Sequence, residues 1–235
     1  MEQIEKAVIL AAGRGTRLGE LTRSVPKPML PIAGRPMLEH ILDRLNAAGI
    51  GRFLIVTGYQ REAIENYFRV GRFSVQFAVQ EPVNGTESAA LLGHDFCESD
   101  SFLLTYGDII CASEEYSRAI GKLGPGADAV LAVKSVDDPW QGAAVYASET
   151  GQITRIVEKP PKGSSTTNWN SAGFYCFRSQ IFSYLQNLTP SARGEYELTS
   201  AIDAMLNDGR VICISEIEGA WRDVGRPEDL AAANA

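Results

Sequence analysis

The first half of the chain alternates apolar runs of strand length with segments whose apolar residues recur at helical spacing. Residues 6–12 form such a run, and residues 36–49 place apolar side chains three and four positions apart before Gly49. Strands that are apolar throughout need cover on both faces, which is typical of a parallel sheet between helices. This half is therefore predicted to be α/β, with further strands at residues 52–57, 74–80, 101–105 and 128–133 and further helices at residues 61–70, 86–96 and 113–123.

After residue 139 the pattern changes, because short strands follow one another without a long helix between them. Residues 160–168 are predicted to form a mobile loop. We expect one mixed α/β domain whose C-terminal part extends the sheet and covers one mouth of a cleft. The elements predicted in this part are strands at residues 143–147, 152–158, 172–177 and 211–216, helices at residues 180–187 and 195–207, and a short helix from Pro227.

The composition bears on the possible partners. The 235 residues carry 29 acidic and 22 basic side chains, a net charge of −7, which argues against a nucleic-acid surface. A phosphorylated small molecule stays compatible with this charge, because a few cations or a divalent metal reverse the field inside one cleft. No apolar run is long enough to span a bilayer, and the first residues lack the features of a signal peptide. We predict a cytoplasmic protein with no nucleic-acid and no membrane partner.

The cysteines show neither a Cys-x-x-Cys spacing nor a nearby His in a zinc pattern. We therefore predict buried, reduced thiols at Cys97, Cys111, Cys176 and Cys213.

A glycine-rich segment follows the first predicted strand. Gly13 and Gly15 lie where a parallel strand turns, and the free backbone N–H groups of such a turn bind anions. A dinucleotide-binding loop would need glycine at position 18, which is Leu18, and the Gly-Lys-Ser/Thr ending of a Walker A loop is missing. A basic surface loop with turn glycines is the remaining alternative. The segment's basic side chains are Arg14, Arg17, Arg23 and Lys27.

Residues 10–18 and 26–32 together resemble the signature of the sugar-1-phosphate nucleotidyltransferases. Members of that family join a nucleoside triphosphate to a sugar 1-phosphate and release pyrophosphate. The resemblance continues in family order through Tyr-Gly-Asp at residues 106–108, Glu-Lys-Pro at residues 158–160, Gly-Glu-Tyr-Glu-Leu-Thr at residues 194–199, and residues 221–230. It implies a single Rossmann-like α/β domain over residues 1–235, with a mostly parallel mixed sheet flanked by helices.

In-line phosphoryl transfer depends on positioning and charge neutralisation, because the attacking phosphate oxygen is already anionic. The resemblance accordingly implies three catalytic cations: Arg17 on the triphosphate, Lys27 on the α-phosphate and Lys159 on the sugar phosphate. It also implies a nucleotide site made of Leu10, Ala11, Ala12, Gly13, Arg14, Gly15, Thr16, Arg17, Lys27, Gln80, Gly85 and Thr86.

The same resemblance implies a magnesium site at Asp108 and Asp223. Two carboxylates with few other protein ligands suit Mg²⁺, which retains water and binds phosphate oxygens.

Gln80 and Gly85 have the spacing at which thymidylyl- and uridylyltransferases of the family place a Gln and a glycine against a pyrimidine. A Gln amide both donates and accepts, so it can pair with the edge of uracil or thymine. This favours UTP or dTTP; the alternative interpretation is that Gln80 merely ends a strand. A mannose-1-phosphate guanylyltransferase and a cytidylyltransferase acting on another phosphorylated alcohol remain alternatives.

The resemblance also implies a site for the sugar phosphate, with glucose 1-phosphate as the leading expectation. Many relatives carry Asn directly before an Ala-Gly pair, whereas this chain has Ser171 there, so the identity of the sugar stays open. Glu195 is expected either to shape the cleft wall or to be an ordinary carboxylate at a helix start. The residues implied for this site are Gly142, Glu158, Lys159, Asn170 and Ser171.

The division of labour implied by the family is a nucleotide-binding half at residues 1–138 and a sugar-phosphate-binding half at residues 139–235. Because little sequence follows the second metal motif, we expect a stand-alone catalytic domain without acetyltransferase activity, as a monomer or homodimer. A non-catalytic nucleotide-sugar sensor is the main alternative of another class. Such a sensor has less need of a complete set of charged site residues, namely Arg17, Lys27, Asp108, Lys159 and Asp223.

Overall fold

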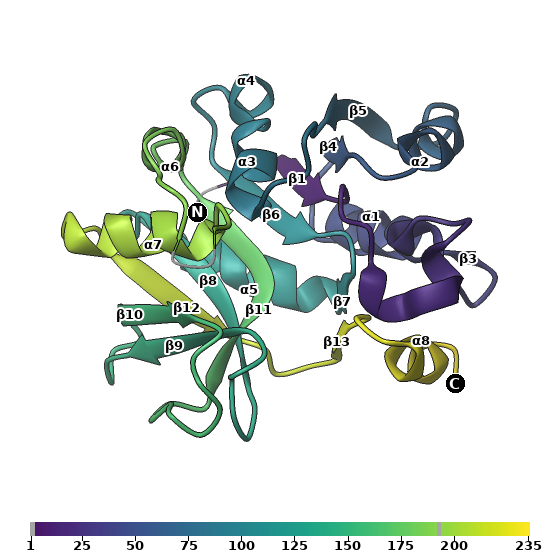
Figure 1. Cartoon of the computed structure of the whole chain (residues 1–235). Helices are drawn as coiled ribbons and strands as arrows, with labels where there is room; N and C mark the ends of the chain where they lie inside the picture. Colours follow the sequence, from purple (N-terminus) through teal and green to yellow (C-terminus); the bar gives the residue numbers. More distant parts are fainter. Residues whose placement is uncertain (1–2, 192–193) are drawn as a thin grey trace.

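The computed structural model of the chain describes residues 3–191 and 194–235. Within these residues, nine strands form one mixed sheet in which β10-β9-β11-β6-β1-β4-β5 are neighbours in this order, while β8 pairs with β11 and β12 pairs with β8 (Figure 1). This arrangement confirms the predicted mixed α/β fold. The strands are β1 (Lys6–Leu10), β4 (Arg52–Thr57), β5 (Ser74–Val79), β6 (Phe102–Tyr106), β8 (Ala129–Ser135), β9 (Ala143–Ala147), β10 (Ile153–Glu158), β11 (Trp169–Phe177) and β12 (Ile212–Glu216).

The parallel part of the sheet lies in the first half of the chain, where β1 pairs with β4 and β6 and β4 pairs with β5. Alternate residues of β1 enter two separate cores: Ile9 packs into the one that contains Met37 of α1, and Val8 into the one that contains Ala90 of α3. Because side chains alternate along a strand, a fully apolar strand feeds both cores at once. The helices are α1 (Met37–Ala47), α2 (Arg61–Phe68), α3 (Thr86–Leu91), α4 (His94–Cys97), α5 (Ser113–Lys122), α6 (Ile181–Leu185), α7 (Leu198–Asn207) and α8 (Pro227–Ala233).

The C-terminal half extends the sheet with antiparallel strands, as the sequence predicts. β11 pairs antiparallel with both β6 and β8, and β9 and β10 form an antiparallel pair beyond it. β12 then returns to pair parallel with β8. In the part of the chain that the structure describes, no helix combines the length and the apolar character that crossing a membrane requires.

Several short elements lie outside the sheet and were not predicted. Most relevant to the site is a two-stranded antiparallel ladder of β7 (Ile109–Cys111) and β13 (Trp221–Asp223), which joins the end of β6 to the C-terminal region. The other short elements are the 3₁₀ helices η1 (Thr16–Thr22) and η2 (Lys27–Met29) and the strands β2 (Pro31–Ile32) and β3 (Arg35–Pro36).

Some predicted elements differ from the structure. The helix expected over residues 86–96 is divided into α3 and α4 around Gly93, which lies so close to β1 that an added Cβ would be 2.9 Å from Val8 Cγ2. The first strand ends at Leu10 rather than residue 12, and α7 begins at Leu198 rather than residue 195. Cys213 is only partly buried, whereas the other three cysteines are buried and all four are free thiols, as predicted.

Candidate active site

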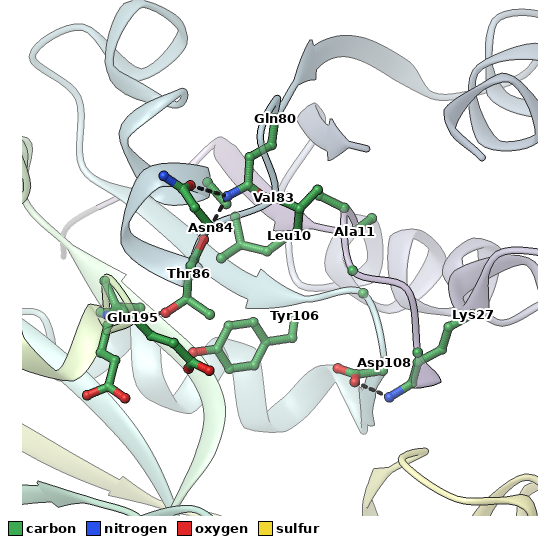
Figure 2. Close-up of a pocket in the computed structure, with 18 of the residues that line it drawn as sticks. Leu10, Ala11, Lys27, Gln80, Val83, Asn84, Thr86, Tyr106, Asp108 and Glu195 are labelled. Carbon is green, nitrogen blue, oxygen red and sulfur yellow. Dashed lines mark hydrogen bonds and ion pairs between the residues drawn. The ribbon is translucent and has the colours of Figure 1, made fainter. Parts of the chain in front are cut away.

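A cavity of about 710 Å³ opens at the carboxyl ends of β1 and β6, where open α/β sheets bind ligands. Its wall comes from the loop after β1, from η2, from the loop before α3, from the ends of β6 and β10, and from residues 194–199 (Figure 2). The sequence-predicted site residues that line it are Leu10, Ala11, Ala12, Gly13, Gly15, Thr16, Arg17, Lys27, Gln80, Gly85, Thr86, Asp108, Glu158, Lys159 and Asp223.

All the charged residues on which the predicted chemistry depends face this single cavity. Arg17 and Lys159 are exposed, while Lys27 is only 8% exposed. Asp108 and Asp223 lie between exposed and buried. These three cations and two carboxylates therefore surround one space in the described part of the chain, together with Glu158, Glu195 and Glu197.

The position of Lys27 is fixed by the chain around it. Lys27 lies between Pro26 and Pro28 at the start of η2, and the fixed φ of proline limits the backbone freedom on either side of it. Gly15 packs directly against the lysine: its φ is +64°, and an added Cβ would be 2.9 Å from Lys27 Cβ. The ammonium group makes an ion pair with Asp108, which Figure 2 marks by a dashed line. Glycine at position 15 thus lets the loop after β1 close around Lys27.

Asp108 and Asp223 are distant in sequence and are brought together by the ladder of β7 and β13. Asp223 is paired with Ile109, and the Val224 N–H donates to the Asp108 carbonyl oxygen at 3.0 Å. The Asp223 Oδ1 atom is buried and has no hydrogen-bond partner among the described residues. Burial, and next the Asp108 carboxylate, raise the pKa of Asp223 to about 6, against the opposing effect of Lys27 and Arg17.

The two carboxylates fit a divalent cation. A buried carboxylate oxygen without a partner, close to a second carboxylate, is an arrangement that a divalent cation would stabilise. No group of three or more His, Cys, Asp and Glu residues that could hold a metal occurs within residues 3–191 and 194–235. Water and phosphate oxygens would therefore complete the coordination, which is the mode of binding that Mg²⁺ favours.

The loop before α3 is held by its own hydrogen bonds. Gln80 is 5% exposed, and its Nε2 donates to the Gly85 carbonyl oxygen at 2.7 Å and contacts Asn84 Oδ1 at 3.5 Å (Figure 2). With Nε2 used in this way, the carbonyl oxygen Oε1 is the part of the amide left to accept a hydrogen bond from a ligand. Gly85 has a φ of +148° and lies against Tyr196, whose carbonyl oxygen would be 2.2 Å from an added Cβ.

A Gly85→Ala substitution is expected to displace this loop, because the new methyl group cannot coexist with the Tyr196 carbonyl and the backbone conformation disfavours L side chains. We expect a loss of about 1–3 kcal/mol in the free energy of unfolding. Urea denaturation measures that loss. A Gly71→Ala substitution, in an exposed segment with no atom within 4 Å of an added Cβ, is the matched control. Equal stability of the two variants would contradict the close packing at Gly85.

Arg14 does not line the cavity, although the sequence places it in the nucleotide site. Its guanidinium group lies 5.5 Å from the ring centroid of Tyr59, in a cation–π arrangement. In this structure the arginine of the loop after β1 that faces the cavity is Arg17.

Gly142, Asn170 and Ser171 do not line the cavity. Gly142 faces Asn170, whose Oδ1 would be 2.3 Å from an added Cβ and has no hydrogen-bond partner in the described chain. The Ser171 hydroxyl lies 3.0 Å from that of Tyr175, which in turn lies 3.5 Å from the Tyr106 hydroxyl. Tyr106 does line the cavity, so these hydroxyl groups connect Ser171 to it.

Part of the cavity wall comes from residues that the sequence did not predict. Residues 196–199 line the cavity, and so do Val83 and Asn84 in the loop before α3. Residues 196–199 could have been predicted, because residues 194–199 form one of the family motifs. Only Glu195 of that motif was assigned a role from the sequence. Glu195 lines the cavity three residues before α7 begins, so it shapes the wall and is not part of the helix.

A family model described as nucleotidyl transferase matches residues 6–235 of the chain. The chain belongs to the nucleotidyl transferase family. This confirms the family predicted from the motifs, and the match extends over both the parallel and the antiparallel parts of the sheet.

Individual members of the nucleotidyl transferase family resemble the chain along nearly all of its length. The bifunctional protein GlmU of Methanococcus maripaludis is 36% identical over 97% of this chain and 53% of the relative, so the chain spans about half the length of that protein. AglF of Haloferax volcanii, named a UTP–glucose-1-phosphate uridylyltransferase, is 36% identical over 95% of this chain and 93% of its own. The solved structure of a putative glucose-1-phosphate thymidylyltransferase from Bacillus anthracis has a TM-score of 0.85 and 30% identity, and covers 97% of this chain and 93% of the other.

Proposed function

We propose that the chain transfers a nucleotidyl group from a nucleoside triphosphate to a sugar 1-phosphate, with release of pyrophosphate. The observation that carries this proposal is the convergence of Arg17, Lys27 and Lys159 with Asp108 and Asp223 on one cavity. A non-catalytic sensor has no need of this complete set. The reaction, by contrast, brings two anions together and requires fixed positive charge at the point of contact.

In the proposed reaction an oxygen of the sugar phosphate attacks the α-phosphorus while the bond from that phosphorus to the pyrophosphate oxygen breaks. Lys27 would bind the α-phosphate, and Arg17 would bind the triphosphate and the departing pyrophosphate. Lys159, next to Glu158 at the end of β10, would orient the sugar phosphate. Asp108 and Asp223 would hold Mg²⁺, which when bound supplies positive charge against the phosphate oxygens.

The favoured substrates are UTP or dTTP and glucose 1-phosphate. The buried Gln80 amide in the loop before α3 supports a pyrimidine base, because its carbonyl oxygen can accept from the N3–H of uracil or thymine. Among the relatives, AglF carries a uridylyltransferase name and the Bacillus anthracis protein a thymidylyltransferase name, both with glucose 1-phosphate.

A pyrophosphate-release screen tests the proposal. The chain is incubated with ATP, GTP, CTP, UTP or dTTP and with a panel of sugar 1-phosphates, with Mg²⁺ or with EDTA. We expect Mg²⁺-dependent release with UTP or dTTP and glucose 1-phosphate. Release with GTP and mannose 1-phosphate would show that the chain uses this pair of substrates and not the favoured one. No release with any pair would contradict the proposed activity.

A Gln80→Ala substitution tests whether this side chain reads the base. Losing one hydrogen bond to the base, together with the bond that holds the loop, is expected to lower kcat/KM about 10-fold to 100-fold with UTP or dTTP. The residual activity with ATP should change much less. Gln76→Ala, on the exposed side of β5, is the matched control. Equal losses with all nucleotides would show that Gln80 supports the loop without selecting the base.

A further inference from the structure

Residues 194–199 touch the loop before α3 at several points. Tyr196 forms an isolated parallel bridge with Gly85, and its carbonyl oxygen accepts a hydrogen bond from the Glu87 N–H at 3.2 Å. Leu198, two residues later, donates its N–H to the Thr86 hydroxyl at 3.0 Å. Figure 2 shows Thr86 on the side of the cavity where Glu195 lies. Residues 80–87, which are the loop before α3 and the first residues of that helix, are called the nucleotide-side loop. This loop is thus bound to the segment that leads into α7.

The contact with Thr86 completes the start of α7. The first N–H groups of a helix have no partner within the helix and are usually satisfied by a side chain just before it. Glu197 occupies that position in α7 and makes no side-chain cap. The first helical N–H, that of Leu198, is satisfied instead by the hydroxyl of Thr86, the first residue of α3. The start of α7 therefore depends on where the nucleotide-side loop lies.

The next residue of α7 reaches the sugar-phosphate side. Thr199 is 7% exposed, and its hydroxyl donates to Glu158 Oε2 at 3.3 Å. Glu158 ends β10, directly before Lys159, and α7 packs against β10. The two threonines thus lie at the ends of one short connection, which runs from the loop that carries Gln80 and Gly85 to the residues proposed to bind the sugar phosphate.

We propose that Thr86 and Thr199 are positioning residues that connect the two substrate sites: the nucleotide-side loop fixes the start of α7 through Thr86, and α7 fixes Glu158 through Thr199. The affinity for the sugar phosphate is thereby set in part from the nucleotide side of the cavity. This inference rests on the proposed function, because it uses the two substrates of that reaction.

The test measures the KM for glucose 1-phosphate at saturating UTP, so that a change in UTP affinity alone does not contribute. Thr86→Val keeps the branched shape but removes the oxygen that accepts the Leu198 N–H. It is expected to raise this KM about fivefold to tenfold, the effect of losing one hydrogen bond. Thr199→Val is expected to raise the KM for glucose 1-phosphate by a similar factor. The serine variants Thr86→Ser and Thr199→Ser keep the hydroxyl group and are expected to have the wild-type KM. Thr154→Val, at an exposed position of the same strand as Glu158, is the matched control and should not change it.

The double variant Thr86→Val/Thr199→Val shows whether the two threonines act on the KM through one connection or independently of each other. If the threonines act through one connection, the double variant raises the KM for glucose 1-phosphate no more than the larger single change. A product of the two single effects would overturn the inference, and so would a Thr86→Val variant that alters only the KM for UTP. If Thr86→Val does not fold, Thr199→Val alone tests the inference, because an unchanged KM for glucose 1-phosphate in Thr199→Val also overturns the inference. A wild-type chain that releases no pyrophosphate refutes the proposed function and this inference with it, whereas an active wild type with insensitive variants refutes the inference alone.

Discussion

A Lys27→Met substitution is expected to lower kcat/KM for pyrophosphate release by about 1,000-fold, through the loss of one fixed charge from the reacting centre. Methionine retains the aliphatic stem that packs against Gly15 but has no ammonium group. The positive charge proposed to meet the α-phosphate is then missing, and Asp108 loses its ion-pair partner beside Asp223. The cavity thereby becomes more negative by one charge, which opposes the approach of two anionic substrates.

Steady-state kinetics with saturating Mg²⁺ measures this loss, and circular dichroism checks that the variant is folded. Lys122→Met is the matched control, because Lys122 is exposed on α5 and its ammonium group donates only to the Ile214 carbonyl oxygen among the described residues. We expect wild-type kinetics from the control. A Lys27→Met variant that retains more than about a tenth of the wild-type kcat/KM would contradict a direct role on the α-phosphate, since such a loss corresponds to less than one ordinary hydrogen bond to a charged group.

The parts of the fold that the sequence predicts are those determined by local pattern. The apolar run of β1 and the helical spacing that ends at Gly49 identify strand and helix without knowledge of their neighbours. The ladder of β7 and β13 could not be predicted in this way, because each strand has three residues and is stabilised by a partner far away in sequence. The break between α3 and α4 likewise depends on how closely Gly93 approaches Val8 of another element.

In the site, too, features set by a local sequence motif could be predicted, whereas features set by contacts between distant segments could not. Lys27 and Asp108 belong to motifs, and both line the cavity. Asn170 and Ser171 stand where this chain departs from the family pattern; they lie on β11 and do not line the cavity, because only packing determines which residue of a strand reaches the surface of a cavity. Thr199 received no role from the sequence, because its contact with Glu158 joins α7 to β10 and leaves no local signal.

An Asp223→Asn substitution is expected to reduce Mg²⁺-dependent pyrophosphate release by about 1,000-fold while making the metal-free protein more stable. Losing a charged ligand weakens the proposed cation site and removes charge compensation from the reaction. In the absence of metal, however, Asp223 is a buried carboxylate next to another carboxylate, and its Oδ1 has no hydrogen-bond partner within the described residues. A neutral side chain of the same shape removes the cost of burying a charge and the repulsion from Asp108.

The sign of the stability effect follows from the pKa of Asp223, which is raised from 3.8 to about 6 in the folded chain. A carboxyl group that holds its proton more tightly when folded destabilises the folded state fully above the folded pKa, and the cost decreases as the pH falls toward the unfolded value. In EDTA at pH 7, Asp223→Asn is therefore expected to raise the free energy of unfolding by up to about 3 kcal/mol, and this gain should decrease between pH 6 and pH 4. Urea denaturation at several pH values measures it.

Two further variants identify the cause of this change. Asp95→Asn, at a fully exposed position, should alter neither activity nor stability. Asp108→Asn should abolish the activity as well but without the same gain in stability, because it removes the charge that pairs with the buried Lys27. If Asp223→Asn lost activity but gained no stability in EDTA at pH 7, its carboxylate would not be the desolvated group described here. If it gained stability and kept Mg²⁺-dependent turnover, the cation would have to bind elsewhere in the cavity.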